Sequence, residues 1–484
     1  MRQRISFWIA LCLPLAGWIT ATAFAVDPTT APSGITPGTA LSGTPCANQP
    51  GVDWIDAATG HRIIRLSTAP GSLSLYFHQF AYTTEGDLVV IYSPNAADPT
   101  KAGLYSVNLR TRKIELIAPG VSYSRGMSSG IEVGRKTRTV YYERRENGQT
   151  SIYATQLDTK ATRKVADLGF NADFGGVNAD ETLMFGDYNV GGGGGRGRGA
   201  AAPGALPATQ AGAGAVPSLP TTIPTTNPAA GRGGARAGRG GGGGGSKQFF
   251  TVNIKTGQVK TFFPSNDNLN HTQCSPTDPM LALYCHEGNW ASLDRIWTIH
   301  LDGTNNKLMH QRTMPNEIAG HEFFTPDGQM VMYDLQTPES GQFWLAGVNV
   351  YTGQRIRYPL ERVQWSVHYN ASHNGKLYAG DGGGPNSVAD RLPGSNQHLN
   401  PPGNGQWMYL FTPKNVPMQT MKVNGEDVQV GAFDVEKLVD LSKHDYTLEP
   451  NLSFTPDDKW IVFRSNISGD SQVYAVEVAK HAAP

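Results

Sequence analysis

The sequence predicts an all-β fold, a seven-bladed β-propeller that an N-terminal strand closes. One pattern begins at His271, His321 and His368: a histidine, four residues, a hairpin turn and an apolar strand. The copies lie about 50 residues apart, which is the spacing of propeller blades. Seven such units fit along the chain, and the last lacks a strand that the isolated strand at residues 61–67 can supply. Pairing the two ends of the chain leaves the sheets without an open edge.

The predicted units follow one another as apolar or alternating strands joined by hairpin turns. The first three begin near Gln79, Ser129 and Phe174. Residues 191–246, almost entirely Gly, Ala, Pro, Thr and Arg, interrupt the third unit. They bury too little apolar surface to offset chain entropy, so we expect a disordered insertion in the third blade. The later units begin at His271, His321, His368 and Asn451. A Gly, Pro and Asn-rich excursion over residues 382–406 divides the sixth.

The N-terminal residues are typical of a secretory signal peptide. Two arginines precede an apolar run, residues 5–19, and a small-residue cleavage site follows at Ala23-Phe24-Ala25. This pattern predicts a cleaved signal at residues 1–25 and no membrane partner afterwards. Residues 26–50 are rich in Thr, Pro, Ser, Gly and Ala and predict a flexible leader, followed by the propeller at residues 51–484. We therefore expect an exported protein, either periplasmic or secreted.

Composition limits the partners. The chain has 484 residues with 40 basic and 40 acidic side chains, and this balance argues against a nucleic-acid partner. Cys46, Cys274 and Cys285 follow the signal, and an odd number leaves at least one of them unpaired. Cys274 and Cys285 either bridge one hairpin or are buried as small apolar side chains, and burial is favoured. The sequence does not indicate an oligomeric state.

Propeller geometry predicts where a functional site lies. The residue that starts each innermost strand faces one rim of the central channel. These residues are Gln79, Ser129, Phe174, His271, His321, His368 and Asn451. The second strand of each blade returns to the same rim and adds His286, Glu287, Asp294, Arg295, Asp334 and Asp381. Single histidines at such positions more often satisfy a buried group, but three in equivalent places beside an arginine favour a site. Imidazole, carboxylate and amide groups can hold a divalent metal, and a free imidazole can act as a general base.

Four segments carry a resemblance to a known family. They contain the CHEG, LDR and GHEF motifs and span residues 270–288, 293–303, 313–328 and 363–383. They resemble the oligogalacturonate lyases, polysaccharide lyases on a seven-bladed propeller. The family cleaves short pectic oligomers by β-elimination with a manganese-type divalent ion. The resemblance implies that His321 is the catalytic base, that Arg295 is the catalytic arginine and that His368 is a metal ligand.

The last blade departs from the family pattern. Where the family has Gln-x-x-His-Pro-His, this chain has Tyr446-Thr-Leu-Glu449-Pro-Asn451. Glu449 and Asn451 offer oxygen ligands, which favour Mn, Mg or Ca over zinc, and His271 is a further candidate ligand. Two alternatives are equally open: that the site binds no metal, and that the protein acts on a different uronide.

The resemblance and the predicted rim together suggest a function. We expect a lyase that converts oligogalacturonides, small acidic oligosaccharides, to 4,5-unsaturated uronates by metal-assisted β-elimination, with Mn²⁺ as the expected ion. The candidate substrate-binding residues are His286, Glu287, Gln79 and Asp381. One alternative is a non-catalytic exported propeller that binds glycans or proteins at its channel face. Another is a lyase for a different uronic acid oligomer.

Overall fold

The computed structural model of the protein describes residues 41, 46–95, 97–121, 123, 128–146, 148–190, 246–384 and 406–481. The predicted signal peptide, most of the predicted leader, residues 191–245 of the predicted insertion and most of the excursion in the sixth unit lie outside the described residues. No helix among the described residues has the length and apolar character needed to cross a membrane.

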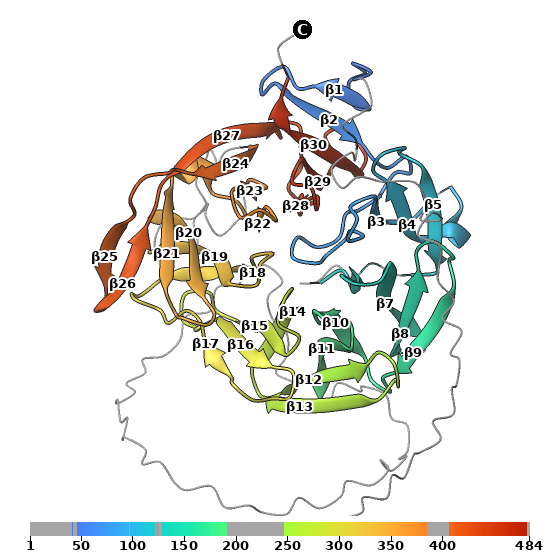
Figure 1. The fold of residues 1–484 in the computed structure, drawn as a ribbon, viewed down its shortest axis with the longest axis horizontal. Helices are drawn as coiled ribbons and strands as arrows, with labels where there is room; N and C mark the ends of the chain where they lie inside the picture. Colours follow the sequence, from blue (N-terminus) through green and yellow to red (C-terminus); the bar gives the residue numbers. More distant parts are fainter. Residues whose placement is uncertain are drawn as a thin grey trace, which may run out of the picture. The chain divides into compact units, whose positions relative to one another are not determined.

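The described strands form seven sheets that stand as blades around one axis (Figure 1). The helical content of the described residues is two 3-10 turns, Pro99–Lys101 and Arg362–Gln364. The predicted all-β, seven-bladed propeller is therefore confirmed.

The first four blades follow the predicted order. Blade one has β3 (Leu88–Ser93), β4 (Gly103–Asn108) and β5 (Ile114–Pro119). Blade two has β6 (Ile131–Val133), β7 (Thr139–Glu146), β8 (Gln149–Gln156) and β9 (Thr162–Asp167). Blade three has β10 (Ala172–Val177), β11 (Leu183–Val190), β12 (Ser246–Asn253) and β13 (Val259–Ser265). Blade four has β14 (Asn268–Cys274), β15 (Leu281–Glu287), β16 (Ile296–His300) and β17 (Lys307–Leu308).

Of the last three blades, the fifth and the seventh carry additional strands, and the sixth has four. Blade five has β18 (Ile318–Phe324), β19 (Met330–Thr337), β20 (Gln342–Asn349) and β21 (Arg355–Leu360). The hairpin of β25 (Gln419–Val423) and β26 (Glu426–Val430) extends blade five, because β26 pairs with β21. Blade six has β22 (Tyr369–Ala371), β23 (Tyr378–Gly380), β24 (Trp407–Pro413) and β27 (Phe433–Asp440). Blade seven has β28 (Ser453–Phe454), β29 (Trp460–Ser465), β30 (Gln472–Lys480), β2 (His61–Arg65) and β1 (Asp53–Ile55).

Three details differ from the expectation. Blade one has three strands instead of four, because the chain ahead of β3 touches the sheet only at the bridges Leu73–Tyr92 and Tyr82–Val89. Ser246, predicted to end the insertion, instead begins β12, where it pairs with Val190. The β25–β26 hairpin was not predicted, since it lies beyond the repeating unit.

The ring closes in blade seven as predicted. β2 pairs antiparallel with β30, so Ile63 faces Val476 and Ile64 faces Ala475 (Figure 1). Both isoleucines are buried, and burial of each side chain contributes about 1.5–3 kcal/mol. The closing blade is also tied to its neighbour, because the carboxylate of Asp53 accepts from Arg62 at 2.9 Å and from Arg112 of blade one at 2.7 Å.

Two short stretches of the predicted leader are described. Leu41 is buried and donates its N–H to the Leu109 carbonyl of blade one at 3.0 Å. Gln49 forms an isolated bridge with Asp53. The described cysteines, Cys46, Cys274 and Cys285, are free thiols, and Cys285 is buried.

Two buried glutamates connect blade two to blade three. Glu132 accepts the N–H of Val177 and Glu143 accepts the N–H of Phe174, each at 3.0 Å. Burial raises the pKa of both carboxyls to about 7. A carboxyl whose folded-state pKa exceeds its unfolded value of 4.5 binds its proton more tightly in the folded protein. The stability that this proton provides is therefore present at low pH and is lost as the pH rises towards 7 and beyond.

We predict that Glu143→Gln flattens this pH dependence, because glutamine keeps the acceptor for the Phe174 N–H and cannot ionise. Relative to wild type, the variant should gain up to about 3 kcal/mol of unfolding free energy between pH 5 and pH 8. Denaturant unfolding at both pH values measures the difference. The exposed Glu426→Gln is the control and should follow wild type. Parallel curves for wild type and Glu143→Gln would contradict the prediction.

Candidate active site in the central channel

The backbone turns the predicted rim residues into the channel. His271, His321 and Asn451 have positive φ angles of 56, 52 and 51° at equivalent positions of three blades. The pairing register shifts at the same points of β14 and β18, as in a β-bulge. A bulge re-aims a side chain, and positive φ costs a non-glycine residue about 1–2 kcal/mol. The surrounding sheets therefore hold these side chains in place against a local strain.

A segment of blade one, residues 74–79, enters the channel; we call it the channel segment. Figure 1 shows the blue chain ahead of β3 reaching into the middle of the ring. Phe77 is buried and stacks on the His368 ring, with centroids 4.5 Å apart. Its N–H donates to Asn451 Oδ1 and its carbonyl accepts from Asn370 Nδ2, both at 3.1 Å. The channel segment thus contacts blades six and seven in the middle of the ring.

The two histidines that the resemblance singled out lie close together. The rings of His321 and His368 are 5.3 Å apart in an edge-to-face arrangement. His321 Nδ1 lies 3.9 Å from Asp334 Oδ2 and has no hydrogen-bond partner among the described residues. Asp334 is buried and accepts from Trp365 Nε1 at 2.7 Å, and burial raises its pKa. A carboxylate in this position can stabilise a proton on His321.

Trp290 connects His321 to the predicted arginine. Its ring centroid is 5.1 Å from that of His321, and the guanidinium carbon of Arg295 lies 3.8 Å above its ring. Arg295 is buried and forms two hydrogen bonds with the carboxylate of Glu287, at 3.0 and 2.8 Å. The arginine is therefore rigidly held on the His321 side of the channel.

His271 is in an internal network instead. Its Nε2 lies 3.1 Å from the hydroxyl of Tyr76, and its Nδ1 lies 3.1 Å from Oε1 of the buried Glu322. Burial opposes ionisation of Glu322, but the neighbouring His271 and Arg295 lower its pKa below the usual value. His271 is thus held by a hydrogen bond at Nε2 and by the nearby Glu322 carboxylate at Nδ1, which itself has no hydrogen-bond partner among the described residues.

Two of the four predicted metal ligands face each other. His368 Nδ1 bonds to the buried carboxylate of Asp381 at 2.9 Å, which leaves Nε2 3.9 Å from Glu449 Oε2. A carboxylate behind a histidine is the usual support for a metal-binding imidazole. The other two predicted ligands have different partners. Asn451 Oδ1 accepts a hydrogen bond from the Phe77 N–H, and the His271 ring contacts Tyr76 and Glu322. The described residues contain no group of three or more His, Cys, Asp or Glu side chains placed around one ion.

His368 Nε2 and Glu449 Oε2 fit two positions of a hard divalent ion. Such ions often take one or two protein ligands and complete their shell with water and substrate oxygens. The Glu449 side chain is 46% exposed, so its carboxylate is accessible from the mouth of the channel.

The predicted substrate-binding residues are spread over different surroundings. Asp381 lies in the site but is occupied by the ring of His368 and the N–H of Asn451. Glu287 is paired with Arg295. Gln79 is buried and bonds to Ser128 and Ser129 of blade two. His286 lies apart, 3.1 Å from Asp267 Oδ2 and packed against Trp297.

Sequence reasoning missed Tyr76, Phe77 and Trp290. The aromatic pair Tyr76-Phe77 just ahead of the first inner strand was a signal for the channel segment, since two large aromatic residues seldom begin an exposed turn. Trp290 had no signal of its own, because it lies in the loop between β15 and β16 and acts through tertiary contacts alone.

The sequence of the second half of the chain matches known proteins. The family model of oligogalacturonate lyase matches residues 245–482. The oligogalacturonate lyase of Dickeya dadantii is 29% identical over 229 residues, which cover 47% of this chain and 54% of that protein. The oligogalacturonide lyase of Pectobacterium atrosepticum is 27% identical over 234 residues, with the same coverage. The chain thus spans about half the length of these relatives in the matched region.

Solved structures share the fold over a larger part of the chain. An oligogalacturonate lyase in complex with manganese has a TM-score of 0.61 at 19% identity, covering 88% of this chain and 96% of that one. An oligogalacturonate lyase from Vibrio parahaemolyticus has a TM-score of 0.60 at 17% identity, with equal coverage. The family model, the relatives and the shared propeller agree with the motifs around His321 and His368, and the second half of the chain is similar to the oligogalacturonate lyases.

Proposed function

We propose that the protein is a carbon–oxygen lyase that cleaves short oligogalacturonides by β-elimination to 4,5-unsaturated uronates. The observation that carries the proposal is the meeting of His321 and His368, with ring centroids 5.3 Å apart, on the side of the channel that holds Arg295. The similarity of residues 245–482 to oligogalacturonate lyases favours this function over a propeller that only binds glycans or proteins. The proposed location is outside the cytoplasm, in the periplasm or the medium, on the basis of the signal-like residues 1–25.

The chemistry requires a base and a positive environment. The C5 proton of a galacturonate unit is α to a carboxylate, and its removal places negative charge on that group. In the proposed reaction His321 takes the proton, and the electron pair of the C5–H bond forms the C4–C5 double bond. The C4–O bond breaks, and the departing oxygen ends with a proton as a hydroxyl. Asp334 stabilises the protonated His321, and Arg295 stabilises the charge on the substrate carboxylate.

The proposed cofactor is a divalent ion, with manganese the expected one. His368 and Glu449 would hold it, with Asp381 orienting the His368 ring. The ion would supply a Lewis-acid charge at the substrate carboxylate.

We predict that His321→Ala lowers kcat on oligogalacturonate by about 100-fold or more, because the general base is removed. The absorbance of the unsaturated product measures the rate. His300→Ala is the matched control, since His300 lies on β16 outside the channel and should leave the rate unchanged. Full activity of a folded His321→Ala protein would refute the assignment of the base.

A second prediction concerns the ion. Calorimetric titration with manganese should show binding to the wild-type protein, weakened by about 10–100-fold in His368→Ala and in Asp381→Asn. Glu449→Gln should also weaken it, while the exposed Asp445→Asn, on the same loop, should not. Equal heats in wild type and His368→Ala would exclude this histidine as a ligand, whatever the activity.

A further inference from the structure

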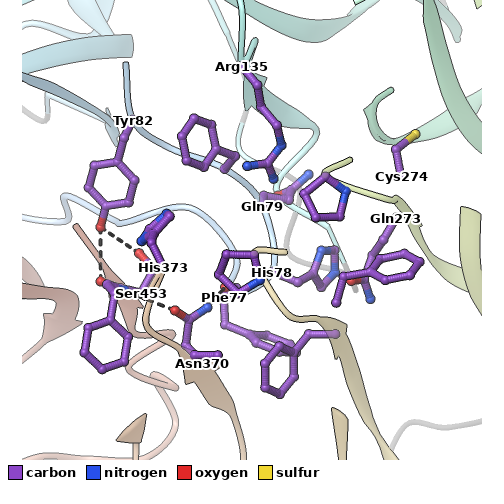
Figure 2. Close-up of a pocket in the computed structure, with 17 residues that line it drawn as sticks. Phe77, His78, Gln79, Tyr82, Arg135, Gln273, Cys274, Asn370, His373 and Ser453 are labelled. Atoms are coloured by element: carbon purple, nitrogen blue, oxygen red, sulfur yellow. Dashed lines mark hydrogen bonds between the residues drawn. The ribbon is translucent and has the colours of Figure 1, made fainter. Parts of the chain in front are cut away.

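A hollow lies between the channel segment and the hairpin turns of the inner strands; we call it the turn-side hollow (Figure 2). Its cavity volume is about 60 Å³, and its walls come from the channel segment and from the inner hairpins of other blades. Aromatic side chains form much of the lining: Phe77, Phe80, Phe323, Phe324 and Phe454. Neither His321 nor Arg295 lines it, so it is separate from the proposed catalytic side.

Most polar side chains of the hollow already have partners. Asn370 donates to the Phe77 carbonyl and accepts from the Phe454 N–H. The Tyr82 hydroxyl bonds to Ser453. Gln79 uses its amide on Ser128 and Ser129 of blade two. These groups build the frame of the hollow and have little capacity left for a ligand.

Arg135 is the exception. Its guanidinium carbon lies 4.2 Å above the Phe80 ring, and Figure 2 shows the side chain pointing into the hollow. Its nearest carboxylate oxygen belongs to Glu132, 3.9 Å away, and it makes no side-chain hydrogen bond with any described residue. The side chain is only 26% exposed. A guanidinium has five N–H donors, and leaving them without acceptors in a partly desolvated place costs free energy.

The charges around Arg135 favour an anion. Glu132 is buried beneath it, and burial raises the pKa of that carboxyl to about 7, which weakens the opposing negative charge near neutral pH. Burial also raises the pKa of the Cys274 thiol, so it is neutral. Across the hollow, His373 Nδ1 lies 3.1 Å from Asp458 Oδ1, an internal pair. Arg135 is the only arginine or lysine among the described lining residues, and its carboxylate partner, Glu132, lies at the long distance of 3.9 Å.

We propose that the turn-side hollow is a ligand site for the carboxylate of a small organic acid, held by the planar fork of Arg135. A guanidinium binds a carboxylate through two parallel hydrogen bonds. Phe324 and Phe454, which also line the hollow, offer flat apolar surfaces for the body of the ligand. A uronate monosaccharide has both features, a carboxylate and an apolar sugar face. The proposal does not depend on the lyase reaction.

Calorimetry of the full protein with D-galacturonate, D-galactose and benzoate tests this site. Wild type should bind galacturonate, and Arg135→Gln should weaken that binding by about 10-fold or more, the loss expected for a charge-assisted pair. Arg144→Gln is the matched control, because Arg144 is on the same blade and also stacks on an aromatic ring, Tyr153, but lies outside the hollow. Arg135→Lys, which keeps the charge without the fork, should bind with intermediate affinity.

The comparison ligands galactose and benzoate, together with the His321→Ala variant, identify the chemical class of the ligand and separate this site from the catalytic one. Galactose should bind at least about 10-fold more weakly than galacturonate, since it lacks the carboxylate. Benzoate binding as strong as that of galacturonate assigns the site to organic acids in general, and weaker binding assigns it to uronates. His321→Ala should retain the Arg135-dependent binding even where elimination is lost. Equal galacturonate affinity in wild type and in a folded Arg135→Gln protein, judged by thermal unfolding, would overturn the proposal.

Discussion

The antiparallel pairing of β2 with β30 is the contact on which the channel depends. Residues that start the innermost strands face a common axis only when the seven sheets form a closed ring. The β2–β30 pairing buries two isoleucines, and beside it the Asp53 carboxylate binds arginines from its own blade and from blade one. Because a pairing between the two ends of the chain holds the ring, the approach of His321 to His368 is a property of the whole fold.

Inside the ring, a buried carboxylate orients two of the rim residues. Asp381 holds both the His368 ring and the backbone of Asn451, so one side chain fixes two blades. Asn451, which stands where the family pattern has a histidine, serves as an anchor for the channel segment through the Phe77 N–H. The residue at which the last blade departs from the family pattern therefore makes a packing contact in the centre of the molecule. Glu449 remains available beside His368.

The sequence allowed the scaffold and part of the site to be predicted. The recurrence of a histidine at His271, His321 and His368 is a local signal, and equivalent positions in a propeller necessarily share one rim. The closing strand was predictable because an unpaired strand and an incomplete blade implied each other. Whether a polar group is free or occupied depends on distant neighbours, so the engagement of Gln79 by Ser129 and of His271 by Tyr76 was not predictable. Trp290 and the channel segment also act through contacts that no spacing encodes.

The channel segment places one phenylalanine ring between two parts of the molecule. Phe77 stacks on His368 and also lines the turn-side hollow. A change in the position of this ring would therefore alter both the support of His368 and the shape of the hollow.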